Sequence, residues 1–162
     1  MFQLFKKKEA PSILLGAPMK GKAVSLKEVN DPTFSEEMLG KGIAIIPEEG
    51  KVYAPADGEV GLVFDTLHAV SITTADGAEV LIHVGLDTVT MKGEGFEACV
   101  KAGDAVKKGD LLLKVDLEKV KAAGFDTITP MIVCNTDDYE AVEALPAEAV
   151  EPGADVVKIA LK

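Results

Sequence analysis

Short runs of alternating hydrophobic and polar residues recur along most of the chain, and glycine, proline and aspartate separate them. The runs expected to form strands are 42–47, 51–55, 59–64, 68–74, 79–86, 110–116, 129–135 and 155–161. Runs spaced by about ten residues, with turn residues between them, are typical of antiparallel sandwiches and barrels. The pattern therefore predicts an all-β fold.

Two stretches carry signals for short helices. Residues 31–39 begin with Asp-Pro and continue with acidic residues, which suits a first helical turn. Residues 116–124 begin with an aspartate that can cap a helix and end with a glycine that can stop one. Segment 143–155 is expected to be a solvated connection before the last strand.

The two histidines lie on either side of an Asp-Gly pair at 76–77. Asp-Gly between two hydrophobic runs is typical of a β-hairpin with a two-residue turn. With that turn, His68 faces Gly85 and His83 faces Val70. The imidazoles then project from one side of the sheet as diagonal neighbours, with Cβ atoms about 7–8 Å apart. A loop one residue longer would place them on opposite faces.

A close pair of imidazoles admits three interpretations. His68 and His83 can be half of a zinc site, although no cluster with ligand spacing supplies the other half. A neutral imidazole is also a nucleophile near pH 7, and a second imidazole beside it can donate a hydrogen bond to an anion. In the third interpretation both rings are half buried and bonded to backbone.

Two more polar residues are expected beside this pair. Thr66 lies two residues before His68, so its hydroxyl shares that face and can orient the imidazole or bind phosphate, unless it is an ordinary strand threonine. Asp87 lies four residues after His83. It either binds an arginine of a partner or ends the strand in solvent.

Composition excludes several classes of function. The chain has 162 residues, 48% of them hydrophobic, which suits one folded domain over 11–162 after a flexible basic tail over 1–10. The net charge of −10 disfavours nucleic acid and favours basic protein partners. No hydrophobic run has the length of a membrane span or a signal peptide, so a cytoplasmic protein is expected, with Cys99 and Cys134 reduced and buried.

The motif HVGLDTVTMKGEGF at 83–96 closely resembles the signature of the glucose-type enzyme IIA family of the bacterial phosphoenolpyruvate:sugar phosphotransferase system. TLHAVSI at 66–72 and GKGIAIIPEEGKVYAPADGEV at 40–60 resemble further segments of that family. The resemblance covers about residues 13–162. It implies an antiparallel β-sandwich, or flattened barrel, with jelly-roll-like connections.

The resemblance also implies a function. His83 matches the histidine that carries phosphate on Nε2, His68 the accessory histidine, and Thr66 the threonine of the same site. Phosphate arrives from the carrier protein HPr and leaves to a cysteine of the enzyme IIB domain of a sugar permease at the inner membrane. No cofactor is implied. Some family members bind regulated metabolic enzymes, sometimes with zinc at the two histidines.

A docking patch is expected around the histidines. The predicted hairpin register places Val70 and Leu81 on their face. The family match adds four hydrophobic and two acidic positions, the latter facing an arginine of the donor: Phe34, Met38, Leu39, Phe64, Asp31 and Asp87.

A biotinyl or lipoyl carrier domain is the alternative. APADGEVGLV and GDAVKKGDLLLKV look like the hairpins of such domains, and Met91-Lys92 provides the dipeptide whose lysine would be modified. In carriers, however, that dipeptide follows the second hairpin, whereas here it precedes it.

Overall fold

The antiparallel strands expected from the sequence are present, together with several shorter ones. The computed structural model describes residues 11–162, so the predicted tail over 1–10 lies outside the described residues. The strands are β1 (Ser12–Gly16), β2 (Gly21–Val24), β3 (Lys41–Pro47), β4 (Lys51–Tyr53), β5 (Gly58–Val63), β6 (Ala69–Thr74), β7 (Glu79–His83), β8 (Phe96–Ala98), β9 (Ala105–Val106), β10 (Leu111–Val115), β11 (Thr129–Val133), β12 (Ala141–Ala144), β13 (Ala147–Val150) and β14 (Asp155–Ala160).

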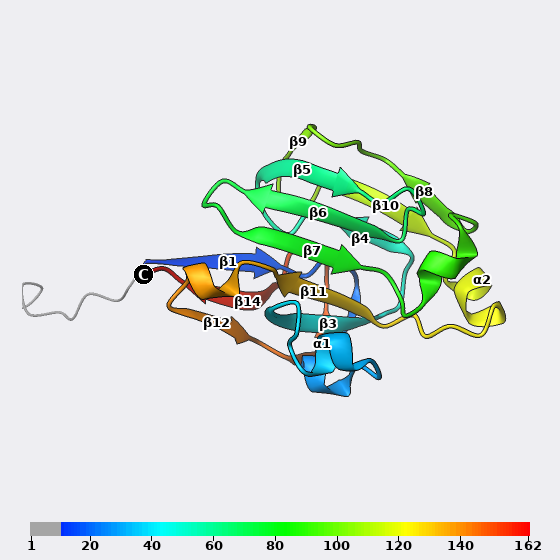
Figure 1. Ribbon diagram of the computed structural model, residues 1–162, viewed down its shortest axis with the longest axis horizontal. Coiled ribbons are helices and arrows are strands. Elements are labelled where there is room, and N and C mark those ends of the chain that lie inside the picture. The colour runs from blue at the N-terminus through cyan, green and yellow to red at the C-terminus, as the bar shows by residue number, and fades with distance from the viewer. Residues whose placement is uncertain (1–10) are drawn as a thin grey trace, which may run out of the picture.

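The strands form three sheets, and every described pairing is antiparallel. One sheet has the order β13-β2-β3-β11-β7-β6-β5-β9, and the others are β4-β10-β8 and β1-β14-β12. Figure 1 shows β5, β6, β7, β11 and β3 side by side, with β4 and β10 behind them. The main hydrophobic core takes residues from all three sheets, among them Val70, Leu113 and Ile159. This arrangement confirms the predicted antiparallel β-sandwich.

A second, smaller core covers the outer face of the large sheet. Phe34, Leu26 and Val29 pack there against Ile132 and Leu86. Phe34, Leu26 and Val29 come from the segment that holds the 3₁₀ helix η2 (Leu26–Glu28) and helix α1 (Pro32–Ser35), which is drawn below β3 in Figure 1. This small core supports the face from which His83 projects.

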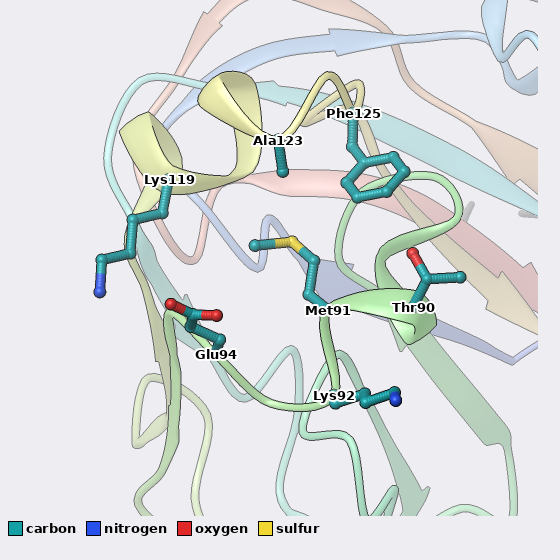
Figure 2. A pocket seen from close by; sticks show the side chains of 7 residues that line it. All are labelled: Thr90, Met91, Lys92, Glu94, Lys119, Ala123 and Phe125. Atoms are coloured by element: carbon teal, nitrogen blue, oxygen red, sulfur yellow. The ribbon is translucent and has the colours of Figure 1, made fainter.

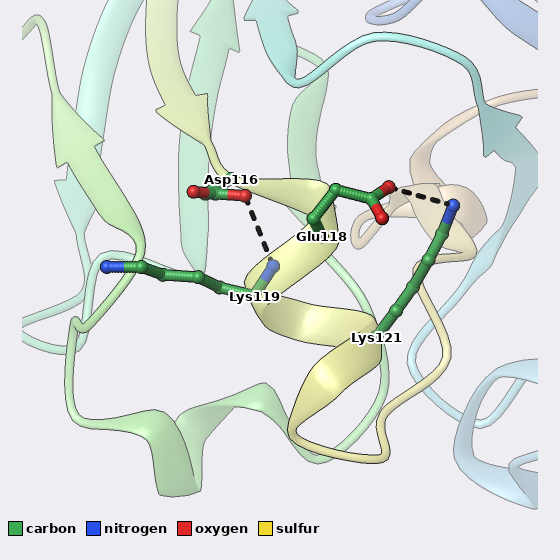
Figure 3. A network of polar contacts seen from close by, with 4 residues as sticks. All are labelled: Asp116, Glu118, Lys119 and Lys121. Carbon is green, nitrogen blue, oxygen red and sulfur yellow. Dashed lines mark hydrogen bonds and ion pairs between the residues drawn. The ribbon is translucent and has the colours of Figure 1, made fainter.

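The helices are short and begin where the sequence predicts. In α1, the side chain of Asp31 accepts a hydrogen bond from the backbone N–H of Thr33. Helix α2 (Leu117–Ala122) is capped by Asp116, which accepts from the backbone N–H of Lys119 (Figure 3). On the solvent side of α2, Lys121 pairs with Glu118 at 3.5 Å. Two further 3₁₀ helices are η3 (Thr88–Met91) and η4 (Thr136–Asp138).

Two sequence-based expectations need correction. Segment 143–155 is not only a connection, since it contains β13 and the end of β12. Its alanines and glutamates gave no strand signal, and pairing with β2 and β14 determines its conformation. Cys99 and Cys134 are exposed rather than buried, because both lie just beyond the end of a strand. Among residues 11–162, no helix is long and apolar enough to cross a membrane.

Candidate functional site

The hairpin that carries the histidines has a loop one residue longer than predicted. Ala69 pairs with His83, and Thr73 with Glu79. Thr74 and Ala78 close a three-residue loop, in which Gly77 has a positive φ of 89°. A type I turn followed by a left-handed glycine is the usual three-residue solution. The predicted pairing of His83 with Val70 is therefore wrong by one residue.

His68 nevertheless lies on the same side as His83, because it belongs to a loop rather than to a strand. β6 begins at Ala69, and the connection from β5 is closed by a hydrogen bond from Phe64 N–H to Ala69 O at 3.0 Å. Within this loop Leu67 adopts a left-handed φ of 61°. Strand alternation does not apply to a loop residue. The expected proximity is thus correct, although the register that suggested it is not.

The two imidazoles are in contact at right angles. Their centroids are 4.8 Å apart with an interplanar angle of 84°. Nδ1 of His83 lies 2.8 Å from the carbonyl oxygen of Gly85, and Nδ1 of His68 lies 2.6 Å from Oγ1 of Thr66. Because a carbonyl only accepts, Nδ1 of His83 must donate, and in the neutral ring Nε2 then holds the lone pair. Thr66 is close enough to orient His68, which is one of the roles that the sequence left open.

Both Nε2 atoms retain some contact with solvent, although His68 is only 2% exposed as a residue. Neither Nε2 has a hydrogen-bond partner within residues 11–162. In the same part of the chain, no side-chain nitrogen or oxygen is both buried and unpartnered. The site therefore presents two adjacent imidazole nitrogens to an incoming group.

Both histidines are held neutral at physiological pH. Burial, followed by the charge on His83, lowers the pKa of His68 from 6.5 to about 4. Burial also lowers the pKa of His83, although the Gly85 carbonyl and the carboxylates of Asp31 and Asp87 act in the opposite direction. A neutral imidazole with a free Nε2 is a nucleophile.

The pKa of His68 makes folding stability depend on pH. The folded pKa lies below the unfolded value, so the unfolded chain binds the proton first as the pH falls from 6.5 towards 4. His68 does not lower the free energy of unfolding well above pH 6.5. Between pH 6.5 and pH 4, this residue alone decreases it by about 3 kcal/mol. Urea denaturation of the wild type and of His68→Gln at pH 7.0 and 4.5 measures this loss in the free energy of unfolding. Equal losses in both proteins would contradict the assignment, since the carboxylates are common to both.

Two phenylalanines bracket the imidazoles. Phe34 of α1 lies over His83, with centroids 5.1 Å apart, and Phe64 meets the edge of His68 at 5.4 Å. Leu81 lies two residues before His83 on β7 and packs on the smaller core. These apolar neighbours limit the hydration of the rings and thereby favour their neutral form.

The predicted docking residues are divided between surface and interior. Met38 and Leu39 are exposed by 70% and 43%, whereas Phe34 is buried against His83. Val70 is fully buried in the main core and pairs with Ile82. Its place in the docking patch was wrong, because the longer loop turns it to the inner face.

Acidic residues stand on both sides of His83. Asp31 is half buried at the start of α1, and Asp87 is exposed after β7 with a left-handed φ of 62°. Each raises the pKa of His83, which places both carboxylates close enough to affect its charge.

Gly85 was missed by the sequence argument as a functional residue. Its carbonyl holds the His83 ring, and its φ of 76° lies in the region that favours glycine. A Cβ there would lie 2.7 Å from Cγ2 of Thr88 and 2.8 Å from the carbonyl oxygen of Asp126. A glycine two residues after a histidine that ends a strand is the signal that could have identified it.

A hollow in the surface of the described chain lies away from the histidines. It has a volume of about 650 Å³ and lies between η3 and α2, where Met91 points towards Phe125 and Ala123 (Figure 2). Lys92 lines this hollow and directly follows η3, so it does not lie in the turn of a hairpin. Within residues 11–162, no three His, Cys, Asp or Glu side chains are grouped to hold a metal ion.

Known proteins are similar to this chain in sequence and in fold. Residues 13–139 match the family model described as phosphoenolpyruvate-dependent sugar phosphotransferase system, EIIA 1. The glucose permease IIA of Mycoplasma capricolum superposes with a TM-score of 0.82 at 36% identity, covering 91% of this chain and 96% of that one.

Curated relatives are of two lengths. The glucose-specific EIIA component of Oceanobacillus iheyensis is 43% identical over 152 residues, which span 94% of this chain and 92% of the relative. The β-glucoside-specific EIIBCA component of Bacillus subtilis is 49% identical over 139 residues, 86% of this chain but only 23% of the relative. The chain thus corresponds to one part of the longer proteins and to nearly all of the shorter ones. It belongs to the EIIA type 1 family, the phosphotransferase components of the phosphoenolpyruvate-dependent sugar phosphotransferase system.

Proposed function

We propose that His83 carries the phosphoryl group of this sugar phosphotransferase component. The observation that supports the assignment best is the hydrogen bond from Nδ1 of His83 to the Gly85 carbonyl, which leaves the lone pair on an accessible Nε2. The donor is a phosphohistidine of HPr, and the acceptor is a cysteine of an enzyme IIB domain. No further cofactor takes part in either transfer.

The chemistry is an in-line displacement at phosphorus. Nε2 of His83 attacks with its lone pair, and the N–P bond to the donor imidazole breaks with its electrons returning to the donor ring. The cysteine thiolate then attacks the phosphorus, and Nε2 of His83 regains its lone pair. Such transfers need positioning and charge stabilisation more than covalent assistance.

His68 stabilises the phosphoryl oxygens in this proposal. When Thr66 donates its hydroxyl hydrogen to Nδ1 of His68, the imidazole carries its own proton on Nε2, which faces the site. A phosphoryl dianion on His83 also raises the pKa of a neighbouring imidazole. His68 therefore becomes a stronger donor at the moment when phosphate is present.

The docking surface surrounds this pair. Met38 and Leu39 supply exposed apolar area, and Phe34, Phe64 and Leu81 line the approach to the rings. Asp31 and Asp87 attract a basic partner, and the net charge of −10 adds to the attraction over longer distances. The patch fits a partner with an apolar centre and an arginine at its rim.

The permease selects the sugar in this proposal. Relatives named for β-glucoside, glucosamine and glucose are 49%, 55% and 43% identical to this chain. One carrier surface thus accompanies different specificities. Relatives that join EIIA to EIIB and EIIC in one chain support an enzyme IIB domain as the acceptor, and the site of action is then the cytoplasmic side of the membrane.

Incubation of the chain with phosphorylated HPr tests the function. One phosphoryl group should be gained, and it should be acid-labile because N–P bonds of phosphohistidine hydrolyse in acid. Peptide mapping at neutral pH should place it on residues 79–91. A biotin or lipoyl adduct on Lys92, without phosphate on His83, would contradict the proposal and support the carrier-domain alternative.

A further inference from the structure

Each of the three successive peptide units between His83 and Leu86 is held by at least one hydrogen bond. The N–H of Val84 donates to the carbonyl of His68 at 2.7 Å. The carbonyl of Val84 accepts from the hydroxyl of Thr88 at 2.5 Å. Thr88 is completely buried, so this bond has no water to replace it. The peptide that leads into Gly85 is thereby fixed in orientation.

The next peptide unit carries the carbonyl that His83 uses. Its N–H, that of Leu86, donates to the carbonyl of Asp126 at 3.0 Å, and its oxygen, that of Gly85, accepts from Nδ1 of His83. In a trans peptide the N–H and C=O point in opposite directions. The two hydrogen bonds therefore restrain this peptide unit from opposite sides. Only the φ and ψ angles of Gly85 connect this unit to the one that Thr88 holds.

Gly85 by itself has unusual freedom. Its φ of 76° is open to glycine, and so are several other conformations that would rotate the carbonyl away from the ring. The methyl group of Thr88 lies against its Cα, since a Cβ built there would be 2.7 Å from Cγ2. Thr88 therefore restrains Gly85 twice, by its hydroxyl on the preceding carbonyl and by its methyl on the glycine itself.

We propose that Thr88 is a positioning residue for phosphoryl transfer, which holds the Val84–Gly85 backbone so that the Gly85 carbonyl keeps the proton of His83 on Nδ1. Thr88 is too deeply buried to touch the phosphoryl group and acts only through this backbone. The inference rests on the proposed function of His83. Its structural part, the tautomer, exists in the unphosphorylated protein and can be measured there.

The test compares Thr88→Val with Thr88→Ser. Valine keeps the shape but removes the hydroxyl, and the ratio of the two His83 tautomers, read from the ¹⁵N shifts of the ring, should move about fivefold towards the Nε2-protonated form. The rate of phosphoryl uptake at saturating phospho-HPr should fall by about five- to tenfold, with the half-saturating concentration unchanged. Serine retains the hydroxyl and should restore both values to within about twofold of the wild type.

Thr129→Val is the matched control. Thr129 is also fully buried, and its hydroxyl also donates to a backbone carbonyl, that of Thr127 at 2.9 Å. It should lose stability without any change in the tautomer of His83. Thr88→Ala, which removes both hydroxyl and methyl, should shift the tautomer at least as far as Thr88→Val and provides a second variant.

Two results would overturn the proposal. One is a wild-type tautomer ratio in Thr88→Val and Thr88→Ala, and the other is an equal shift in Thr129→Val. Failure of the proposed function looks different, because the wild type would then take up no phosphate on His83 while the tautomer shifts remained as described.

Discussion

His83→Gln is expected to take up no phosphate from phospho-HPr. Glutamine places an amide where the imidazole presents Nε2, and an amide nitrogen has no available lone pair for attack on phosphorus. The initial rate of uptake should fall by at least about a thousandfold. The measurement is the mass of the intact protein at neutral pH after incubation with the phosphorylated donor.

Folding must be shown to survive this substitution. His83 is half-buried at the end of β7, and its side chain is the hydrogen-bond partner of the Gly85 carbonyl. Equal midpoints of thermal unfolding for the variant and the wild type therefore provide the control. Uptake by His83→Gln at the wild-type rate would show that another residue carries the phosphate, and the site assignment would be wrong.

The strand pattern predicted the fold because hydrophobic alternation determines which face of a strand is buried. The pattern did not predict strands whose conformation depends on pairing with a neighbouring strand rather than on hydrophobic alternation. β12 and β13 consist largely of Ala and Glu, and they become strands because β14 and β2 offer free edges. The amino-acid sequence of the segment alone does not indicate these two strands.

The pairing of the histidines was predicted from an incorrect register. The Asp-Gly pair favours a two-residue turn, but Ala75 joins the loop and shifts every pair by one residue. The prediction survived because His68 lies before the first residue of β6, in a loop bent by the left-handed Leu67. Val70 lies inside the strand, so the observed register places it in the core rather than beside the histidines.

The environment of the imidazoles was the part least accessible to sequence. Spacing suggested that Thr66 lies beside His68, and the hydrogen-bond distance of 2.6 Å agrees. The Gly85 carbonyl depends on backbone angles, and the cover of Phe34 depends on how α1 packs on the large sheet. Both are tertiary features, and together they determine the charge and tautomer of His83.

His68→Gln is expected to separate the two transfers. In the first, the leaving group is a neutral imidazole, and His83 competes with it as a similar neutral base. In the second, a thiolate must approach a dianionic phosphoryl group, so a hydrogen-bond donor on the phosphoryl oxygens has a larger effect. The variant should accept phosphate from HPr, but its transfer to an enzyme IIB domain should slow by about a hundredfold or more.

Single-turnover kinetics with the purified phosphorylated variant measures that second step directly. Phosphorylated wild type is the reference, and Thr66→Val is the matched variant, because it leaves the imidazole in place but removes the hydroxyl that orients it. The rate of phosphoryl transfer from Thr66→Val should lie between the rates of His68→Gln and the wild type. If His68→Gln passed its phosphate on as fast as the wild type, the imidazole 4.8 Å from His83 would have no part in stabilising the transferred group. Its contact with His83 would then be a matter of packing alone.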